Sequence, residues 1–145
     1  MNLRTYAGRL GEWPPTVELP WDYFQKRSCF VDCRGPLVIA AGSIWGFGVQ
    51  VLTVSHDIEA WPTMGPTIPY GVTVESGAWI GSLSLLTGCT ICAGAIVAAG
   101  TVVRGQMVVP GVMVAGNPAR VVARWNGTKW AYLLAKASGF SRDLQ

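Results

Sequence analysis

The sequence predicts an all-β fold in which short parallel strands wind into a solenoid, a parallel β-helix. Three observations predict it: apolar residues recur every six positions, glycine recurs at the fourth position of these units, and small or β-branched residues fill the fifth. A period of six fits neither an α-helix, which repeats every 3.6 residues, nor a plain strand, which repeats every two. Three such units make one triangular coil, and the coils stack at the roughly 4.8 Å spacing of hydrogen-bonded strands.

The repeat comprises ten six-residue units in three blocks. The fourth residue is glycine in seven units, although the chain has only 18 glycines among 145 residues. An apolar residue at every sixth position points into the core, and glycine permits the tight turn between faces. The ten apolar first positions are Ile39, Trp45, Val51, Ile68, Val74, Ile80, Leu85, Ile91, Val97 and Val103.

The repeat is interrupted twice within the expected solenoid, residues 31–117. Residues 56–67 contain Trp61-Pro62 and Gly65-Pro66 and lack the period, so we expect an excursion loop there. Between Ile80 and Leu85 one unit is a residue short, and the pattern itself gives no reason for it.

The segments on either side of the solenoid have other patterns. Residues 1–30 lack the repeat and contain Trp-Pro and Pro-Trp pairs, which predicts an irregular cap over the open edge of the first coil. After the Asn117-Pro118 turn, residues 118–145 form a tail. In this tail Thr128 is a suitable N-cap, and apolar residues recur at helical spacing, so we expect a short helix over residues 129–138.

Composition excludes several classes of protein. Half of the residues are hydrophobic, which excludes disorder, and the net charge of +3 is not gathered into a basic run, so nucleic acid is not implied as a partner. No apolar run reaches the roughly 18 residues of a membrane span, and no segment looks like a signal peptide, so we expect a cytoplasmic protein. Charged residues make up only 13%, which favours self-association.

The four cysteines form a CxxxC and a CxxC pair, a spacing that also occurs in zinc sites. Two of them fall on repeat positions that call for small or apolar residues, so we favour a packing role and expect no metal. Disulfides are not expected in a reducing compartment. The residues are Cys29, Cys33, Cys89 and Cys92.

Four motifs resemble the hexapeptide-repeat acyltransferase family, in particular the sugar O-acetyltransferases of the maltose, galactoside and colanic-acid types. The motifs are TVSHD at 53–57, WIGS at 79–82, LLTGCTICAGAIVAAGTVV at 85–103 and VMVAGNPARVVARW at 112–125. The resemblance implies a left-handed coil and acetyl-CoA as co-substrate. It also implies a homotrimer whose active sites lie between adjacent subunits.

His56 is the only histidine and lies in the SHD motif. Transfer of an acetyl group from a thioester to a hydroxyl needs a base that takes the hydroxyl proton, and imidazole can do this near neutral pH. The resemblance therefore predicts His56 as the general base, without an acyl-enzyme intermediate. A solvent-exposed loop histidine is the alternative from composition alone.

The resemblance implies roles for seven further residues. Asp57 and Trp79 are candidate contacts of the acceptor, although Asp57 also suits a local turn and Trp79 a subunit interface. The coenzyme is expected to meet the backbone near Ser82 and Ala99, and arginines bind its phosphates. Those arginines are Arg104, Arg120 and Arg124, with Arg120 as the best candidate.

Three alternatives to a sugar O-acetyltransferase stay open to different degrees. A zinc carbonic anhydrase on the same coil needs several histidines per site, and the chain has one. A non-catalytic scaffold and an N-acetyltransferase that acts on an amino sugar remain. The sequence does not identify the acceptor.

Overall fold

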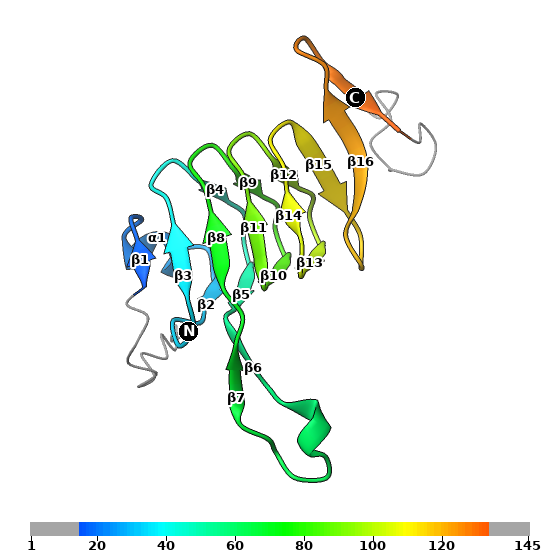
Figure 1. The fold of residues 1–145 in the computed structure, drawn as a ribbon. Coiled ribbons are helices and arrows are strands. Elements are labelled where there is room, and N and C mark those ends of the chain that lie inside the picture. Colours follow the sequence, from blue (N-terminus) through cyan, green and yellow to red (C-terminus); the bar gives the residue numbers. More distant parts are fainter. Residues whose placement is uncertain (1–14, 134–145) are drawn as a thin grey trace.

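The structure, a computed structural model, describes residues 15–133. The chain passes through three parallel sheets in turn, so that each coil gives one strand to each sheet, and the coils lie side by side (Figure 1). Strands dominate and helices are few, which confirms the all-β prediction.

We name the three sheets A, B and C. Sheet A contains β1 (Thr16–Val17), β3 (Leu37–Ile39), β8 (Val72–Val74), β11 (Cys89–Ile91) and β14 (Met107–Val108). Sheet B contains β2 (Phe30–Val31), β5 (Gln50–Leu52), β10 (Leu85–Thr87) and β13 (Val102–Arg104). Sheet C contains β4 (Ile44–Trp45), β9 (Trp79–Ile80), β12 (Ile96–Val97), β15 (Val112–Ala115), β16 (Arg120–Trp125) and β17 (Trp130–Tyr132).

The core is a column of side chains that point inward from all three sheets. Eight of the ten predicted first positions are at most 3% exposed: Ile39, Trp45, Val51, Val74, Ile80, Ile91, Val97 and Val103. The other two predictions are wrong. Ile68 lies outside the coil in β7 (Thr67–Pro69), and the inward residue of β10 is Leu86 rather than Leu85.

The position of Leu86 explains the short unit. From β8 on, strand partners in successive coils are seventeen residues apart, as in Leu86 and Val103 or Trp79 and Ile96. The missing residue lies at the corner from sheet B to sheet A, because only five residues separate the inward Leu86 from Ile91. The next coil repeats the short turn from Val103 to Val108. We call this edge the B–A corner.

Residues 15–30 cover the first coil. Strand β1 adds to the edge of sheet A, and helix α1 (Trp21–Gln25) inserts Phe24 into the open end of the core. Phe24 is fully buried and meets the Trp45 ring edge-on at 5.3 Å between centroids. An aromatic ring thus shields the apolar end of the column from water.

The predicted helix over 129–138 is wrong where the structure describes it. Residues 130–132 form β17, an edge strand antiparallel to β16, and the residues from 134 on lie outside the described part. The Asn126 side-chain oxygen accepts the backbone N–H groups of Thr128 and Lys129 and so makes a hairpin turn. This turn sets Trp130 opposite Trp125, and the paired indole rings outweigh local helix propensity.

An arm leaves the solenoid at the B–A corner, between β5 and β8. It is longer than the expected 56–67 loop and consists of β6 (Val54–His56), the short 3-10 helix η1 (Ile58–Ala60) and β7. Strands β6 and β7 pair with each other in a separate two-stranded sheet, and the arm extends away from the coils (Figure 1). The arm carries His56, so the fold presents this residue on a projecting, hydrogen-bonded element.

Candidate functional site

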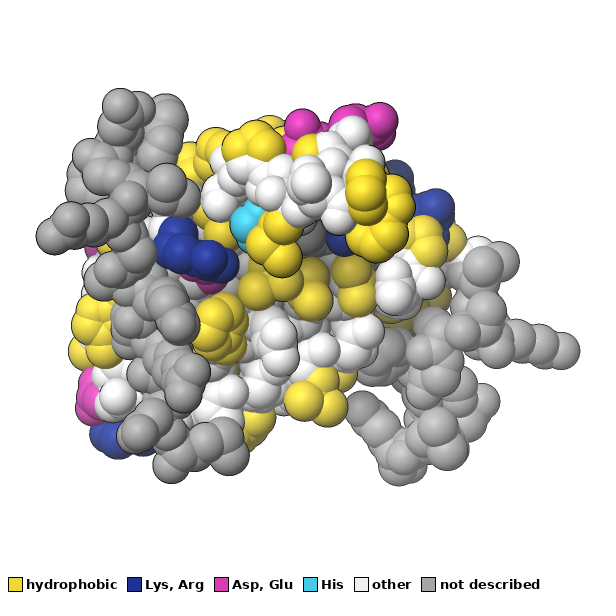
Figure 2. All heavy atoms as spheres, turned by 90° about the horizontal axis from the view of Figure 1, so that it is seen from below, with side chains coloured by type: hydrophobic (Ala, Val, Ile, Leu, Met, Phe, Trp, Pro, Cys, Tyr) yellow, Lys and Arg dark blue, Asp and Glu magenta, His cyan; other side chains and the backbone are white. Residues whose placement is uncertain are grey.

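His56 is exposed at the end of β6, opposite Thr67. Its ring nitrogen Nδ1 lies 2.8 Å from the carbonyl oxygen of Gly65. A carbonyl can only accept a hydrogen bond, so this contact places the proton on Nδ1 and leaves the Nε2 lone pair free. Figure 2 looks at the side toward which the arm extends and shows the histidine at the surface among hydrophobic side chains. The contact therefore leaves Nε2 as the acceptor nitrogen of the ring.

Gly65 holds the His56 ring through this contact, and the sequence analysis does not single it out. A Cβ atom at this position would overlap the backbone oxygen of Asp57 and lie 2.8 Å from the Ala60 Cβ. Only glycine lets the returning chain come close enough to offer its carbonyl to His56. The Gly65-Pro66 pair is the sequence signal at this position, and by itself it predicts only a turn.

The Asp57 carboxylate has a local role in this structure. Its Oδ1 accepts the Glu59 backbone N–H at 3.0 Å and caps η1, and the Asp57 N–H donates to the Pro66 carbonyl. These bonds close the arm behind His56. They match the turn interpretation of Asp57, and an acceptor contact stays a proposal.

The base of the arm is tied to the coil through Thr53. Its hydroxyl donates to the Asp32 carbonyl and accepts the Gly35 N–H, while its own carbonyl accepts the Tyr70 N–H at 2.6 Å. Asp32 is fully buried and binds Arg34 through both carboxylate oxygens. Burial opposes its ionisation, but the Arg34 hydrogen bonds and charge prevail and hold the pKa of Asp32 below its usual range.

Ser82 and Ala99 lie at the corner between sheets C and B, on adjacent coils. The Ser82 hydroxyl accepts the Phe47 N–H. Within the described residues, the backbone N–H groups of Ser82 and Ala99 donate to no partner. A Cβ on Gly46 or Gly81 would lie 2.5 Å from one of these nitrogens, so both glycines are needed for the coils to stack here. The corner thus presents backbone donors that a ligand can use.

Trp79 is about half exposed and points outward from sheet C. It belongs to a row of apolar residues in strand register across the whole sheet, which we call the sheet C row. The row consists of Ile44, Trp79, Ile96, Met113, Ala123 and Tyr132.

The three predicted arginines are exposed but do not form one cluster by strand position. Arg104 ends β13 in sheet B, whereas Arg120 and Arg124 lie on β16 in sheet C. The Asn117-Pro118 turn before β16 lies over β13, because Ala119 donates to the Val102 carbonyl. None of the three forms an ion pair with another described residue, and the sequence has no acidic residue between positions 76 and 142. The end of the solenoid is therefore positively charged.

All four cysteines are buried and unpaired. Burial raises the pKa of Cys33 to about 11 and that of Cys89 to about 12. Between residues 15 and 133 no group of three or more His, Cys, Asp or Glu side chains is placed to hold a metal ion. Over the same range no helix has the length and apolar character needed to cross a membrane.

Comparison with known proteins finds no matching family model and no matching curated protein. Among solved structures, a hexapeptide-repeat containing acetyltransferase from Vibrio cholerae matches in two crystal structures at 31% identity over 66% of this chain. The TM-score is 0.55 for the structure complexed with acetyl coenzyme A and 0.58 for the other. A maltose O-acetyltransferase from Clostridium difficile matches at 24% identity over 68% of this chain, with a TM-score of 0.55, and supports the fold alone.

The chain spans just over half the length of these structures, between 53% and 56% of each. This chain shares the repeat architecture with the Vibrio protein, and close to a third of the aligned residues are identical in the two. The structural neighbours of this chain are therefore hexapeptide-repeat acetyltransferases, which confirms the family resemblance that its repeat and motifs indicate.

Proposed function

We propose that this chain transfers an acetyl group from acetyl-CoA to a hydroxyl group of a saccharide, with His56 as the general base. The observation that carries the proposal is the hydrogen bond from His56 Nδ1 to the Gly65 carbonyl, which leaves Nε2 free on an exposed arm. The comparison supports acetyl transfer, since one neighbour is an acetyltransferase complexed with acetyl coenzyme A.

The chemistry assigned to His56 is proton transfer. Nε2 takes the proton of the acceptor hydroxyl as its oxygen attacks the thioester carbonyl, and the protonated imidazole later returns a proton to the leaving thiolate. The carbonyl of Gly65 keeps Nδ1 as the donor throughout, so the ring does not have to turn. Such a base contributes about 10²–10⁴ in rate.

The coenzyme side of the site uses backbone donors and arginines. The unpartnered N–H groups of Ser82 and Ala99 suit hydrogen bonds to the thioester oxygen and the amide groups of the coenzyme. Arg120, with Arg104 and Arg124 nearby in sequence, suits the phosphates, because no acidic side chain in the described residues neutralises these guanidinium groups.

Self-association would complete the site. The His56 arm ends in three apolar side chains that are more than four-fifths exposed, Ile58, Trp61 and Met64, and Ile44 and Trp79 of the sheet C row are about half exposed and form a second apolar surface. Exposure of such large apolar side chains to water is unfavourable. We therefore propose that another copy of the chain covers both apolar surfaces, in the homotrimer that the resemblance implies. Light scattering on the purified protein measures the mass of the assembly and so tests the proposed homotrimer directly.

The function is tested by replacing His56 with alanine and with glutamine. Thiol release from acetyl-CoA is measured with neutral sugars and with amino sugars as acceptors. Both variants should lose at least about 10² in kcat and keep their affinity for acetyl-CoA. Near-normal turnover in His56→Ala would rule out the proposed base, and no coenzyme binding by the wild type would favour a non-catalytic scaffold.

A further inference from the structure

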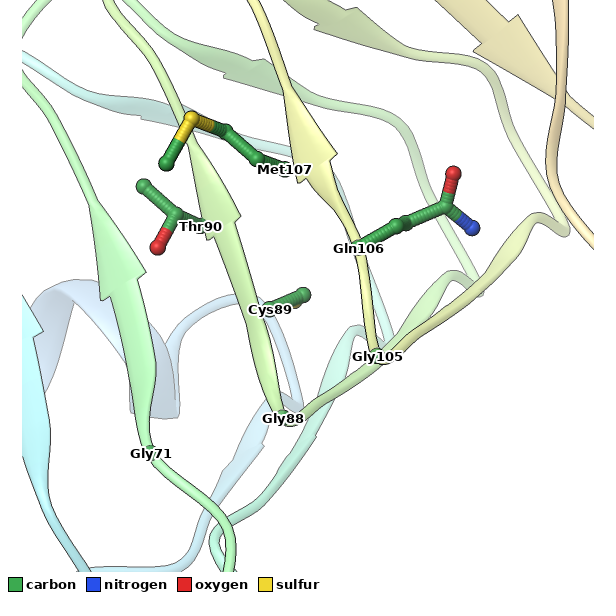
Figure 3. Close-up of a pocket in the computed structure, with 7 residues that line it drawn as sticks. All are labelled: Gly71, Gly88, Cys89, Thr90, Gly105, Gln106 and Met107. Atoms are coloured by element: carbon green, nitrogen blue, oxygen red, sulfur yellow. The ribbon is translucent and has the colours of Figure 1, made fainter.

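The B–A corner carries a groove that the proposed chemistry does not use. It has a volume of about 230 Å³ and is lined by residues of three successive coils (Figure 3). The lining consists of Gly71, Gly88, Cys89, Thr90, Gly105, Gln106 and Met107. The groove lies where the last two coils are each one residue short at this corner and turn through glycine with positive φ, 52° at Gly88 and 62° at Gly105. No side chain fills the space above Gly105 within 4 Å.

The groove begins at the base of the His56 arm. A Cβ atom on Gly88 would lie 3.4 Å from the Tyr70 ring, so this ring lies directly over the start of the groove. Tyr70 follows β7 and is 42% exposed. His56 pairs with Thr67, three residues before Tyr70, so His56 lies about 10 Å along the arm from Tyr70, which stands at the start of the groove.

The lining has the chemistry that a sugar ring requires. Figure 3 shows Thr90 and Met107 side by side on adjacent coils, whereas the Gln106 side chain extends away from them on the other side of its strand. Neither the Thr90 hydroxyl nor the Gln106 amide has a hydrogen-bond partner among the described residues. The Tyr70 ring and the exposed Met107 offer apolar surface for the C–H face of a pyranose. No lining side chain is charged, which does not suit a phosphate or carboxylate.

We propose that this groove binds one ring of a neutral oligosaccharide acceptor, next to the ring that is acetylated. The inference rests on the proposed function and extends it. Because His56 lies about 10 Å along the arm from the start of the groove, one ring cannot occupy the groove and also present its hydroxyl to Nε2. An acceptor with two or more rings satisfies both positions, so the groove selects for chain length.

The test measures binding separately from catalysis. Maltotriose, cellotriose and xylotriose are titrated by calorimetry and by saturation-transfer NMR into wild type, His56→Ala and the double variant Thr90→Val with Gln106→Ala. Thr16→Val and Gln50→Ala serve as matched controls, since these exposed residues lie on β1 and β5 and do not line the groove. At least one trisaccharide should bind wild type and His56→Ala alike, and the double variant should weaken it about tenfold or more.

Kinetics provide the second readout. In the double variant, KM for the trisaccharide should rise while kcat, KM for acetyl-CoA and the rate with a monosaccharide stay unchanged. The inference is overturned if no trisaccharide binds, if the double variant binds as tightly as wild type, or if only trigalacturonate binds and does so through Arg104. Failure of the proposed function alone has another signature: trisaccharide binding persists, but His56→Ala leaves turnover unaffected or wild type transfers no acetyl group.

Discussion

Replacing Gly65 with alanine tests how strictly the arm positions His56. The new Cβ would lie 2.8 Å from the Ala60 Cβ and 3.0 Å from the Asp57 Cβ, and it would also overlap the Asp57 carbonyl. Unstrained carbon atoms approach to about 3.5–4.0 Å, so the returning strand has to move by about 1 Å. That shift takes the Gly65 carbonyl away from Nδ1, now 2.8 Å from it, and releases the imidazole from one fixed orientation.

A displacement of about 1 Å at a catalytic group can cost about 10² in rate. We therefore expect kcat of Gly65→Ala to fall about a hundredfold in the thiol-release assay, with unchanged binding of acetyl-CoA. The unfolding midpoint should hardly move, because the arm lies outside the core column. Thr63→Ala, which removes a tip hydrogen bond to the Ala60 carbonyl, is the matched control and should keep most of its activity. The reasoning is refuted if Gly65→Ala works at the wild-type rate.

Three further predictions concern stability and reactivity. Phe24→Ala should lower the free energy of unfolding by about 3–5 kcal/mol in urea titrations, because the ring is fully buried at the open end of the core, and an unchanged midpoint would show that the cap contributes little. Asp32→Asn tests the buried ion pair, because the lowered pKa of Asp32 means that its ionised form stabilises wild type above about pH 4. This contribution is lost as pH falls through the lower folded-state pKa, so the free energy of unfolding of wild type should drop more steeply than that of the variant between pH 5 and 3. The raised pKa values of Cys33 and Cys89 predict that both thiols stay protonated and unreactive toward a disulfide reagent at pH 8 until guanidinium exposes them, and rapid labelling of the native protein would contradict this.

The solenoid could be predicted because its signal is local and repeated. Each inward residue contributes the same apolar pattern, so Ile39, Val74 and Val97 were correctly assigned to the core from spacing alone. The inward residue that follows Ile80 was assigned wrongly, because Leu85 and Leu86 are both apolar and sequence spacing does not say which of them faces the core. The strand register decides for Leu86.

The tail was mispredicted for a different reason. Trp130 and its neighbours have helical spacing, but their conformation depends on a partner strand that approaches from earlier in the chain. Propensity within one segment does not report such a partner. The hydrogen bonds of Asn126 could have been anticipated, since Asn-Gly is a strong hairpin signal.

The candidate site also contains one part that the sequence predicts and another that only the structure reveals. His56 was found from its motif, whereas the Gly65 carbonyl that orients it lies nine residues away and is recognisable only once β6 and β7 pair. The groove at the B–A corner could not be predicted either, because it lies where a residue is missing from each of the last two coils and no single residue marks it.

The reversal of direction after β15 limits growth of the solenoid. A parallel coil exposes a strand edge on which another coil of the same kind can be added, and stacked copies of such edges would form a filament. Strand β16 runs antiparallel to β15 and β17 folds back along β16, so this hairpin occupies the edge of sheet C on which a further coil would be added. At the opposite end, α1 blocks the same approach. The molecule can thus associate through its flanks while both of its ends resist polymerisation.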